Sequence, residues 1–191
     1  MVIFVDMDGV LSDLDGQVAR RADVNIERLG KDRELRRELI INSIRSQGLE
    51  HWTGLAPMNK QDWVRKFRTW TSWGHQVEIL TSYGIDFSPL HTKDHGLLGR
   101  FELEALAHRG KAQWLETHYG DQCLDNSIRA FNGVGTCGGK ARFGRPDTLL
   151  IDDQPENVRE FRAAGGSSLQ YRADQHDAVM SNAEILLRPR S

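Results

Sequence analysis

The sequence is poor in cysteine and has no long apolar run. Its two cysteines, Cys123 and Cys137, form no Cys-x-x-Cys pair and have no histidine cluster beside them. Neither a disulfide framework nor a structural zinc site is therefore expected. No apolar stretch approaches the length that spans a membrane. The first apolar segment, Met1-Val-Ile-Phe-Val5, is too short for a signal peptide, so we expect a cytoplasmic protein with reduced cysteines.

An excess of one charge is also missing. The 191 residues include 25 Lys and Arg against 27 Asp and Glu, a formal net charge of −2. This balance gives no electrostatic reason to expect bulk binding of nucleic acid or of a membrane. The length predicts one compact domain with room for a modest insertion.

Short apolar segments that indicate buried strands alternate with segments of helical spacing. The expected strands are residues 2–5, 77–80, 127–131, 148–151 and 168–171. The expected helices are 17–47, 60–73, 100–119 and 155–164, with Gly48, Gly74 and Gly120 as stops after the first three. The alternation predicts an α/β fold, with a parallel sheet covered by helices on both faces.

Glycine and proline mark the connecting segments. Residues 49–59 are expected to be irregular, 83–99 to form a loop, and the glycine-rich stretch 132–146 to form a mobile one. The tail from Arg172 is weakly patterned.

Three of the expected strands end in polar residues. Because ligands bind at the carboxyl ends of the strands in parallel sheets, the three ends are expected to converge on one site. The polar ends are Asp6-Met-Asp8-Gly9, Thr81-Ser82 and Asp152-Asp153.

These residue types suit chemistry on a phosphate ester. One carboxylate of the Asp6 and Asp8 pair can attack phosphorus while the other handles protons. Asp152 and Asp153 offer hard oxygen ligands to a divalent cation, whose charge would offset the repulsion among the four acids. The simpler alternatives are a solvated acidic turn after the first strand and a helix-capping role for Asp153.

Phosphoryl transfer also needs a cation that bridges the nucleophile and the phosphate. Two lysines are candidates. Lys111 lies on the helix expected at 100–119, and Lys140 lies in the glycine-rich stretch, closer in sequence to Asp152.

The order Asp-x-Asp-Gly-Val-Leu, Leu-Thr-Ser, Lys, Ile-Asp-Asp resembles the haloacid dehalogenase superfamily of phosphotransferases over residues 2 to about 171. The resemblance implies a Rossmann-like core, an Mg²⁺ ion and a phosphorylated aspartate. It implies that Asp6 is the nucleophile and Asp8 the general acid and base. It also implies phosphate-binding and metal-binding sets. The phosphate-binding set is Thr81, Ser82 and Lys111, and the metal-binding set is Asp6, Asp8, Asp152 and Asp153. Lys111 is preferred to Lys140 because it lies on a helix within the resemblance.

A narrower resemblance is to the 5′(3′)-deoxyribonucleotidases. The matching segments are Asp6 to Asp13 with Gly16, Trp52 to Met58, Leu80 to Ser82, Lys111 to Gly120 and Leu149 to Asp153. The resemblance implies a nucleoside monophosphate as substrate and a small helical cap at 14–74, inserted in a core of 1–13 and 75–191. It places Trp52 where a cap aromatic stacks on the base. The aromatic residues of 60–73 are expected to form the cap's own core.

Three other functions remain open at this stage. A polynucleotide 3′-phosphatase uses the same chemistry, and a strongly basic groove would favour that function. The same chemistry also serves a phosphatase of sugars or other metabolites. A non-catalytic binding module would be favoured by the loss of Asp6 or Asp8, and both are present.

Overall fold

Five parallel strands form the centre of the protein. The computed structural model describes residues 1–82, 100–124, 131–134 and 139–188. The strands lie in the order β3-β2-β1-β4-β5, which confirms the predicted α/β fold. Their bounds are β1 Val2–Val5, β2 Gln76–Ser82, β3 Phe131–Val134, β4 Thr148–Asp152 and β5 Ser167–Gln170. Val5 pairs in register with Ile79 and with Ile151, so the three central strands end at one edge.

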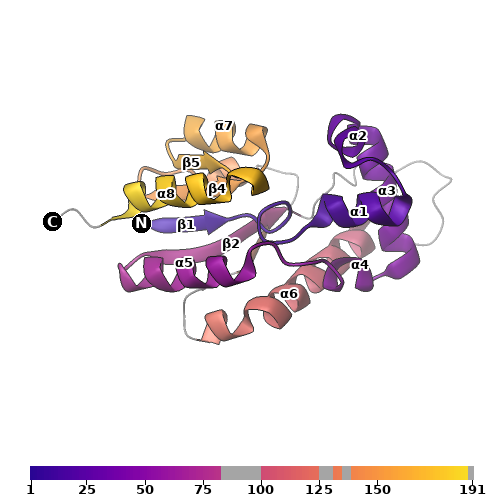
Figure 1. Cartoon of the computed structure of the whole chain (residues 1–191), viewed down its shortest axis with the longest axis horizontal. Coiled ribbons are helices and arrows are strands. Elements are labelled where there is room, and N and C mark those ends of the chain that lie inside the picture. The colour runs from indigo at the N-terminus through magenta and orange to yellow at the C-terminus, as the bar shows by residue number, and fades with distance from the viewer. Residues whose placement is uncertain (83–99, 125–130, 135–138, 189–191) are drawn as a thin grey trace.

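Helices cover both faces of the sheet (Figure 1). On one face, Phe4, Leu80 and Leu150 pack against Phe161 of α7 (Pro155–Ala163). The other face carries the larger core beneath α5 (Lys60–Ser72), α6 (Arg100–Leu124) and α8 (His176–Leu187). In β1, for example, Ile3 and Val5 point to the larger core and Phe4 to the other face. Such alternation of buried side chains along a strand is expected in a sheet that is covered on both faces.

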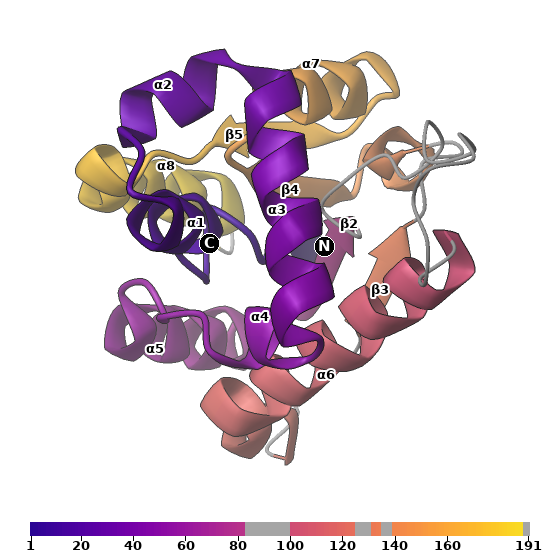
Figure 2. The same cartoon turned by 90° about the vertical axis from the view of Figure 1, so that its right-hand side faces the viewer.

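A cap of four helices lies beyond the carboxyl ends of the strands, and α3 crosses in front of them (Figure 2). The cap helices are α1 Leu14–Ala22, α2 Ile26–Lys31, α3 Arg33–Gln47 and α4 Glu50–Thr53. The prediction of one helix over 17–47 is therefore wrong. Asp23 adopts a left-handed φ of 53°, and the side chains of Asn25 and Asp32 each cap a new helix.

The two links between cap and core run side by side. The amide of Asp13 donates to the carbonyl of Ala56 at 3.0 Å, and the amide of Met58 donates to the carbonyl of Leu11 at 2.7 Å. The next helix, α5, lies on the sheet against β2 and α6. We therefore propose that the cap is 14–58 and that α5 belongs with the core.

The aromatic residues of α5 support this division. Trp63 packs against Tyr171 with ring centroids 5.8 Å apart, and Phe67 packs against Tyr119 at 5.9 Å. Both partners lie outside the cap, in the core beside the sheet. These side chains fill the main core, and the expectation that they form a separate cap core is wrong.

Several element bounds differ from the predictions. Helix α6 continues through Gly120 to Leu124. The glycine-rich stretch overlaps β3 at its start and contains a short 3-10 helix, η2 (Lys140–Phe143). The weakly patterned tail forms η3 (Ala173–Gln175) and α8. The predicted strand at 127–131 and the predicted loop at 83–99 fall, apart from Phe131, outside the described residues.

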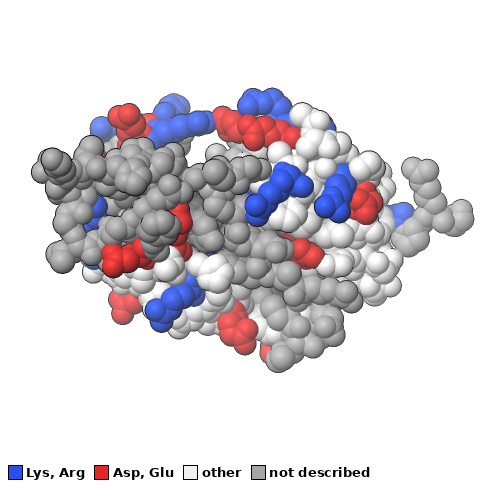
Figure 3. Space-filling view, turned by 180° about the vertical axis from the view of Figure 1, so that it is seen from behind, with Lys and Arg blue, Asp and Glu red and all other residues white. Residues whose placement is uncertain are grey.

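Among the described residues, no helix has both the length and the apolar character needed to cross a membrane. On the described part of the face seen in Figure 3, basic and acidic side chains are interspersed. Neither sign forms a continuous patch there, which agrees with the small net charge.

Candidate active site

The first strand delivers Asp6 to the carboxyl edge of the sheet. Its side chain is almost completely buried, and its Oδ1 accepts a hydrogen bond of 2.7 Å from the amide of Met7. The chain then turns sharply at Gly9, where φ is 74°. A Cβ atom at Gly9 would lie 2.5 Å from Oδ2 of Asp153, so glycine allows this turn to approach the second pair of acids closely.

Three carboxylates gather at this edge. Asp6, Asp152 and Asp153 each offer an oxygen within 4.8 Å of the others. Burial raises the pKa of Asp152, and the charge of Asp6 raises it further. Burial, followed by the charges of Asp6 and Asp152, raises the pKa of Asp153 well above its usual range. Crowded, buried carboxylate oxygens of this kind suit a hard divalent cation.

Asp152 is the most firmly held of the three acids. Its Oδ1 accepts hydrogen bonds from the amide of Gln154 at 2.8 Å and from Nδ2 of Asn157 at 3.0 Å. Asp153 instead accepts from the side chain of Gln154 at 2.8 Å. The contact with the first turn of α7 therefore comes from Asp152 and not from Asp153, against the capping alternative. Sequence reasoning missed Asn157; its position in the first turn of the helix after the paired acids was the available signal.

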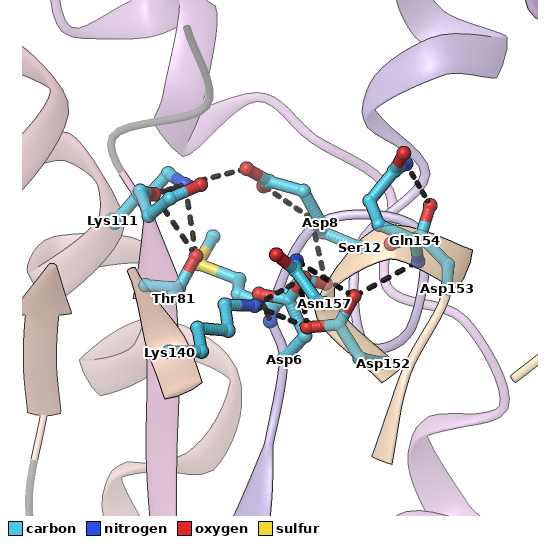
Figure 4. Close-up of polar contacts among 12 residues, drawn as sticks. Asp6, Asp8, Ser12, Thr81, Lys111, Lys140, Asp152, Asp153, Gln154 and Asn157 are labelled. Atoms are coloured by element: carbon cyan, nitrogen blue, oxygen red, sulfur yellow. Dashed lines mark hydrogen bonds and ion pairs between the residues drawn. The ribbon is translucent and has the colours of Figure 1, made fainter. Parts of the chain in front are cut away.

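Lys140 lies inside the acid cluster (Figure 4). Its Nζ is 2.8 Å from Oδ2 of Asp6 and 2.5 Å from Oδ2 of Asp152, and its side chain is 2% exposed. Burial alone would lower the pKa of Lys140, but the charges and hydrogen bonds of the two aspartates raise it above its usual value. The expectation of a lysine in an open loop is wrong, because η2 packs against α7 and buries the side chain.

Lys111 lies at a different point of the site, beside Asp8. Its Nζ donates to Oδ2 of Asp8 at 2.5 Å, to Oγ1 of Thr81 at 3.0 Å and to the carbonyl of Ser82 at 2.5 Å. Thr81 and Ser82 do converge with the acids, as the strand ends predict. Lys111 was expected to bridge the proposed nucleophile and the phosphate, but it is Lys140 whose Nζ contacts Asp6. A phosphate-binding role for Lys111 stays a prediction.

The carboxylate of Asp8 turns away from the other acids and toward Lys111 (Figure 4). Its Oδ1 accepts a hydrogen bond of 3.3 Å from the hydroxyl of Ser12, whose backbone forms a bridge with Asp8 and another with Pro57. Ser12 was not singled out from the sequence. It donates to Oδ1 of Asp8, whereas Lys111 donates to Oδ2. A metal-binding role for Asp8 stays a prediction.

Trp52 lies in α4 and not on an irregular stretch, and its side chain is completely buried. The ring of His51 packs edge-on against it, with centroids 4.6 Å apart. The ammonium group of Lys111 lies over the indole, 4.9 Å from its centroid. A base stacks only on an exposed ring face, so the expected stacking surface is not present in this structure.

The fold and the site together define an α/β protein with a carboxylate- and lysine-rich site at the carboxyl edge of its sheet. No family model and no curated protein matches the chain. Among solved structures, it is similar to a D,D-heptose 1,7-bisphosphate phosphatase from Burkholderia thailandensis, with 11% identity, a TM-score of 0.41 and coverage of 98% of this chain and 99% of the other. It is also similar to a predicted HAD-like family hydrolase from Porphyromonas gingivalis, with 17% identity, a TM-score of 0.39 and coverage of 99% and 98%. Neither likeness is strong enough to assign a function.

Proposed function

We propose that the protein is a magnesium-dependent phosphomonoester hydrolase of the haloacid dehalogenase superfamily that works through a phosphorylated Asp6. The observation that carries the proposal is the separation of the two carboxylates of the Asp-x-Asp motif. Asp6 lies in the acid cluster with Lys140, whereas Asp8 lies outside it with Lys111. Two carboxylates in such different environments suit two different roles.

The donor set fits Mg²⁺. Asp6, Asp152 and Asp153 would hold the ion through carboxylate oxygens, which are the ligands that this hard cation prefers. When bound, it would offset the mutual repulsion of the acids and the charge of a substrate phosphate. The raised pKa values of Asp152 and Asp153 support the need for such a positive charge.

The residues of the chain divide the reaction into two steps. In the first, a carboxylate oxygen of Asp6 attacks phosphorus, the ester P–O bond breaks, and the leaving oxygen takes a proton from Asp8. In the second, Asp8 takes a proton from water while the water oxygen attacks the phosphorus on Asp6. Inorganic phosphate leaves and the Asp6 carboxylate is restored. Lys140 offsets negative charge next to Asp6 throughout.

For the substrate we propose a small phosphate ester, with nucleoside monophosphates as the first class to test. The motif resemblance to the deoxyribonucleotidases supports this choice. The burial of Trp52 does not, because it removes the residue that was expected to stack on a base.

The experiment is a phosphate-release screen with Mg²⁺ across deoxy- and ribonucleoside monophosphates, sugar phosphates, a 3′-phosphorylated oligonucleotide and p-nitrophenyl phosphate. Asp6→Asn serves as the matched inactive control. The proposal expects release that the control lacks, with the highest kcat/KM on a nucleoside monophosphate. A higher kcat/KM on a sugar phosphate or on the oligonucleotide would support the proposed reaction but would show that a nucleoside monophosphate is not the preferred substrate. No release above the Asp6→Asn control from any member would overturn the proposed function.

A further inference from the structure

The ammonium group of Lys111 is surrounded on all sides. The side chain has no exposed surface. Its three N–H bonds meet three acceptors, which are the Asp8 carboxylate, the Thr81 hydroxyl and the Ser82 carbonyl. The indole face of Trp52 lies beside the same group, 4.9 Å from ring centroid to Nζ. A cation over an indole is attracted by the negative face of the ring, most strongly when both are shielded from water.

We propose that Trp52 is a positioning residue for the reaction: its ring holds Lys111 in the orientation that keeps Asp8 outside the acid cluster. This inference rests on the proposed function of the site. Trp52 itself touches no reacting atom. It acts through Lys111, whose contact with Asp8 fixes where the proton donor points.

The close packing of helix α4 against helix α6 fixes the position of the Trp52 ring. Gly110 precedes Lys111 on α6, and a Cβ atom there would lie 2.5 Å from Cβ of Trp52 and 2.6 Å from Cδ1. Only glycine lets α4 of the cap approach α6 so closely. The cap thus supplies one wall of the site occupied by a lysine of the core.

The ring face, and not the indole N–H, makes the useful contact. Nε1 of Trp52 is buried and has no hydrogen-bond partner among the described residues. His51 also packs against the ring. Its pKa is lowered to about 3 by burial and then by Arg21 and Lys111, so it is neutral near pH 7. Among the residues that the structure describes, Lys111 is therefore the cation that the ring contacts, and a phenyl ring should replace the indole in part.

The first test compares Trp52→Phe and Trp52→Leu with p-nitrophenyl phosphate as substrate. Trp52→Leu is expected to lower kcat by roughly 3- to 30-fold, the range that a cation–π contact provides, with little change in KM. Trp52→Phe is expected to recover most of that loss. The matched control is Trp70→Leu, because Trp70 is equally buried and its Nε1 also has no partner, but it lies on α5. Trp70→Leu is expected to lower the melting temperature with no such loss of kcat.

A second test does not depend on catalysis. Urea unfolding of the wild type, Trp52→Leu, Lys111→Met and the double variant gives the coupling between the two side chains. A coupling corresponding to roughly 3-fold or more in the unfolding equilibrium constant is expected. Additive effects would overturn the inference, and so would equal losses of kcat in Trp52→Leu and Trp70→Leu. An inactive wild type with a measurable coupling would overturn the proposed function, and with it the catalytic part of the inference, while leaving the contact established.

Gly110→Ala provides an independent variant that leaves the chemistry of the lysine and the indole unchanged. The added methyl group would overlap Cβ, Cγ and Cδ1 of Trp52, so Trp52 and Gly110 must move apart. A folded Gly110→Ala protein is therefore expected to show a loss of kcat like that of Trp52→Leu. Unchanged kcat together with a shifted tryptophan fluorescence spectrum, which would report a displaced ring, would contradict the inference.

Discussion

The ammonium nitrogen of Lys140 lies 2.8 Å from Oδ2 of Asp6. The same nitrogen contacts Asp152, so one buried cation joins the proposed nucleophile to a proposed metal ligand. Lys111 makes the equivalent contact with Asp8. Each carboxylate of the Asp-x-Asp motif therefore has a lysine of its own, and the two lysines come from different elements, η2 and α6.

Replacing each lysine with methionine should separate their roles. Lys140→Met is expected to lower kcat/KM by about a hundredfold or more, because it removes the positive charge beside the site of attack. Lys111→Met is expected to lower kcat/KM by a smaller factor, since it disturbs Asp8, the proposed proton donor, and not Asp6, the proposed nucleophile. Phosphate release by the two purified variants, measured at the same Mg²⁺ concentration, shows which substitution lowers kcat/KM more. A larger loss at Lys111 would restore the preference drawn from the sequence.

Lys140→Met should also lower stability. Its removal leaves Asp6 and Asp152 buried without their cation, a change that typically costs about 3–5 kcal/mol. Mg²⁺ is expected to recover part of this loss if it binds the same acids. Urea unfolding of the variant with and without Mg²⁺ measures both effects, and a free energy of unfolding of the variant that does not change with Mg²⁺ would contradict a metal at this cluster.

Asp6→Asn should abolish turnover while the fold is kept. The amide cannot form the phosphorylated intermediate. The change removes the attraction to Lys140 but also the repulsion from Asp152 and Asp153, so the two effects oppose one another and the melting temperature should move little. Phosphate release and thermal unfolding of the same preparation check this. Wild-type turnover in a folded Asp6→Asn protein would show that another group is the nucleophile.

The sheet and the strand ends were predictable because their signals are local. Val2–Val5 and Thr148–Asp152 are short apolar segments followed at once by acids, and the parallel arrangement brings such ends to one edge. The convergence of Thr81 with these acids follows from the same argument. Helix α8 was not predicted from the weakly patterned tail, although its buried residues Val179, Ala183 and Leu187 recur every four residues.

The choice between the two lysines and the burial of Trp52 were not predictable, because both depend on packing between distant segments. Lys140 looked exposed beside glycines, and only the contact of η2 with α7 buries it among the acids. Trp52 is buried by the close approach of α4 to α6, which depends on Gly110, about sixty positions away in the sequence. Neither contact leaves a periodic pattern in the sequence.

Removing the metal should stop the reaction and lower stability. Excess EDTA is expected to abolish phosphate release, because the clustered acids would otherwise repel a phosphate. In the absence of substrate, Mg²⁺ at about 100 times its Kd should add about 2.7 kcal/mol to the free energy of unfolding. Asp153→Asn should weaken this stabilisation, whereas Asp62→Asn, at an acid on α5 paired with Arg65, should not. Full turnover in EDTA would exclude the proposed mechanism.

His51 should make the folded state sensitive to acid. Its ring is completely buried; Nδ1 lies 2.8 Å from the hydroxyl of Ser43, and Nε2 has no partner among the described residues. Burial, followed by the charges of Arg21 and Lys111, lowers its pKa from the ordinary 6.5 to about 3. Below pH 6.5 the imidazole of His51 is therefore protonated in the unfolded chain, whereas in the folded protein it stays neutral until the pH approaches 3.

The contribution of His51 should therefore destabilise the protein progressively as the pH falls from about 6.5 toward 3, by up to about 1.4 kcal/mol per pH unit. His51→Gln removes the titration and keeps a polar side chain that can reach Ser43. Its free energy of unfolding, measured by urea at several pH values from 7.5 down to 4.5, should lie below that of the wild type at pH 7.5 and fall less steeply with acid. The raised pKa values of Asp152 and Asp153 act in both proteins and cancel in the difference. Two parallel curves over this range would show that His51 is protonated in the folded state, and that its site tolerates a positive charge beside Lys111.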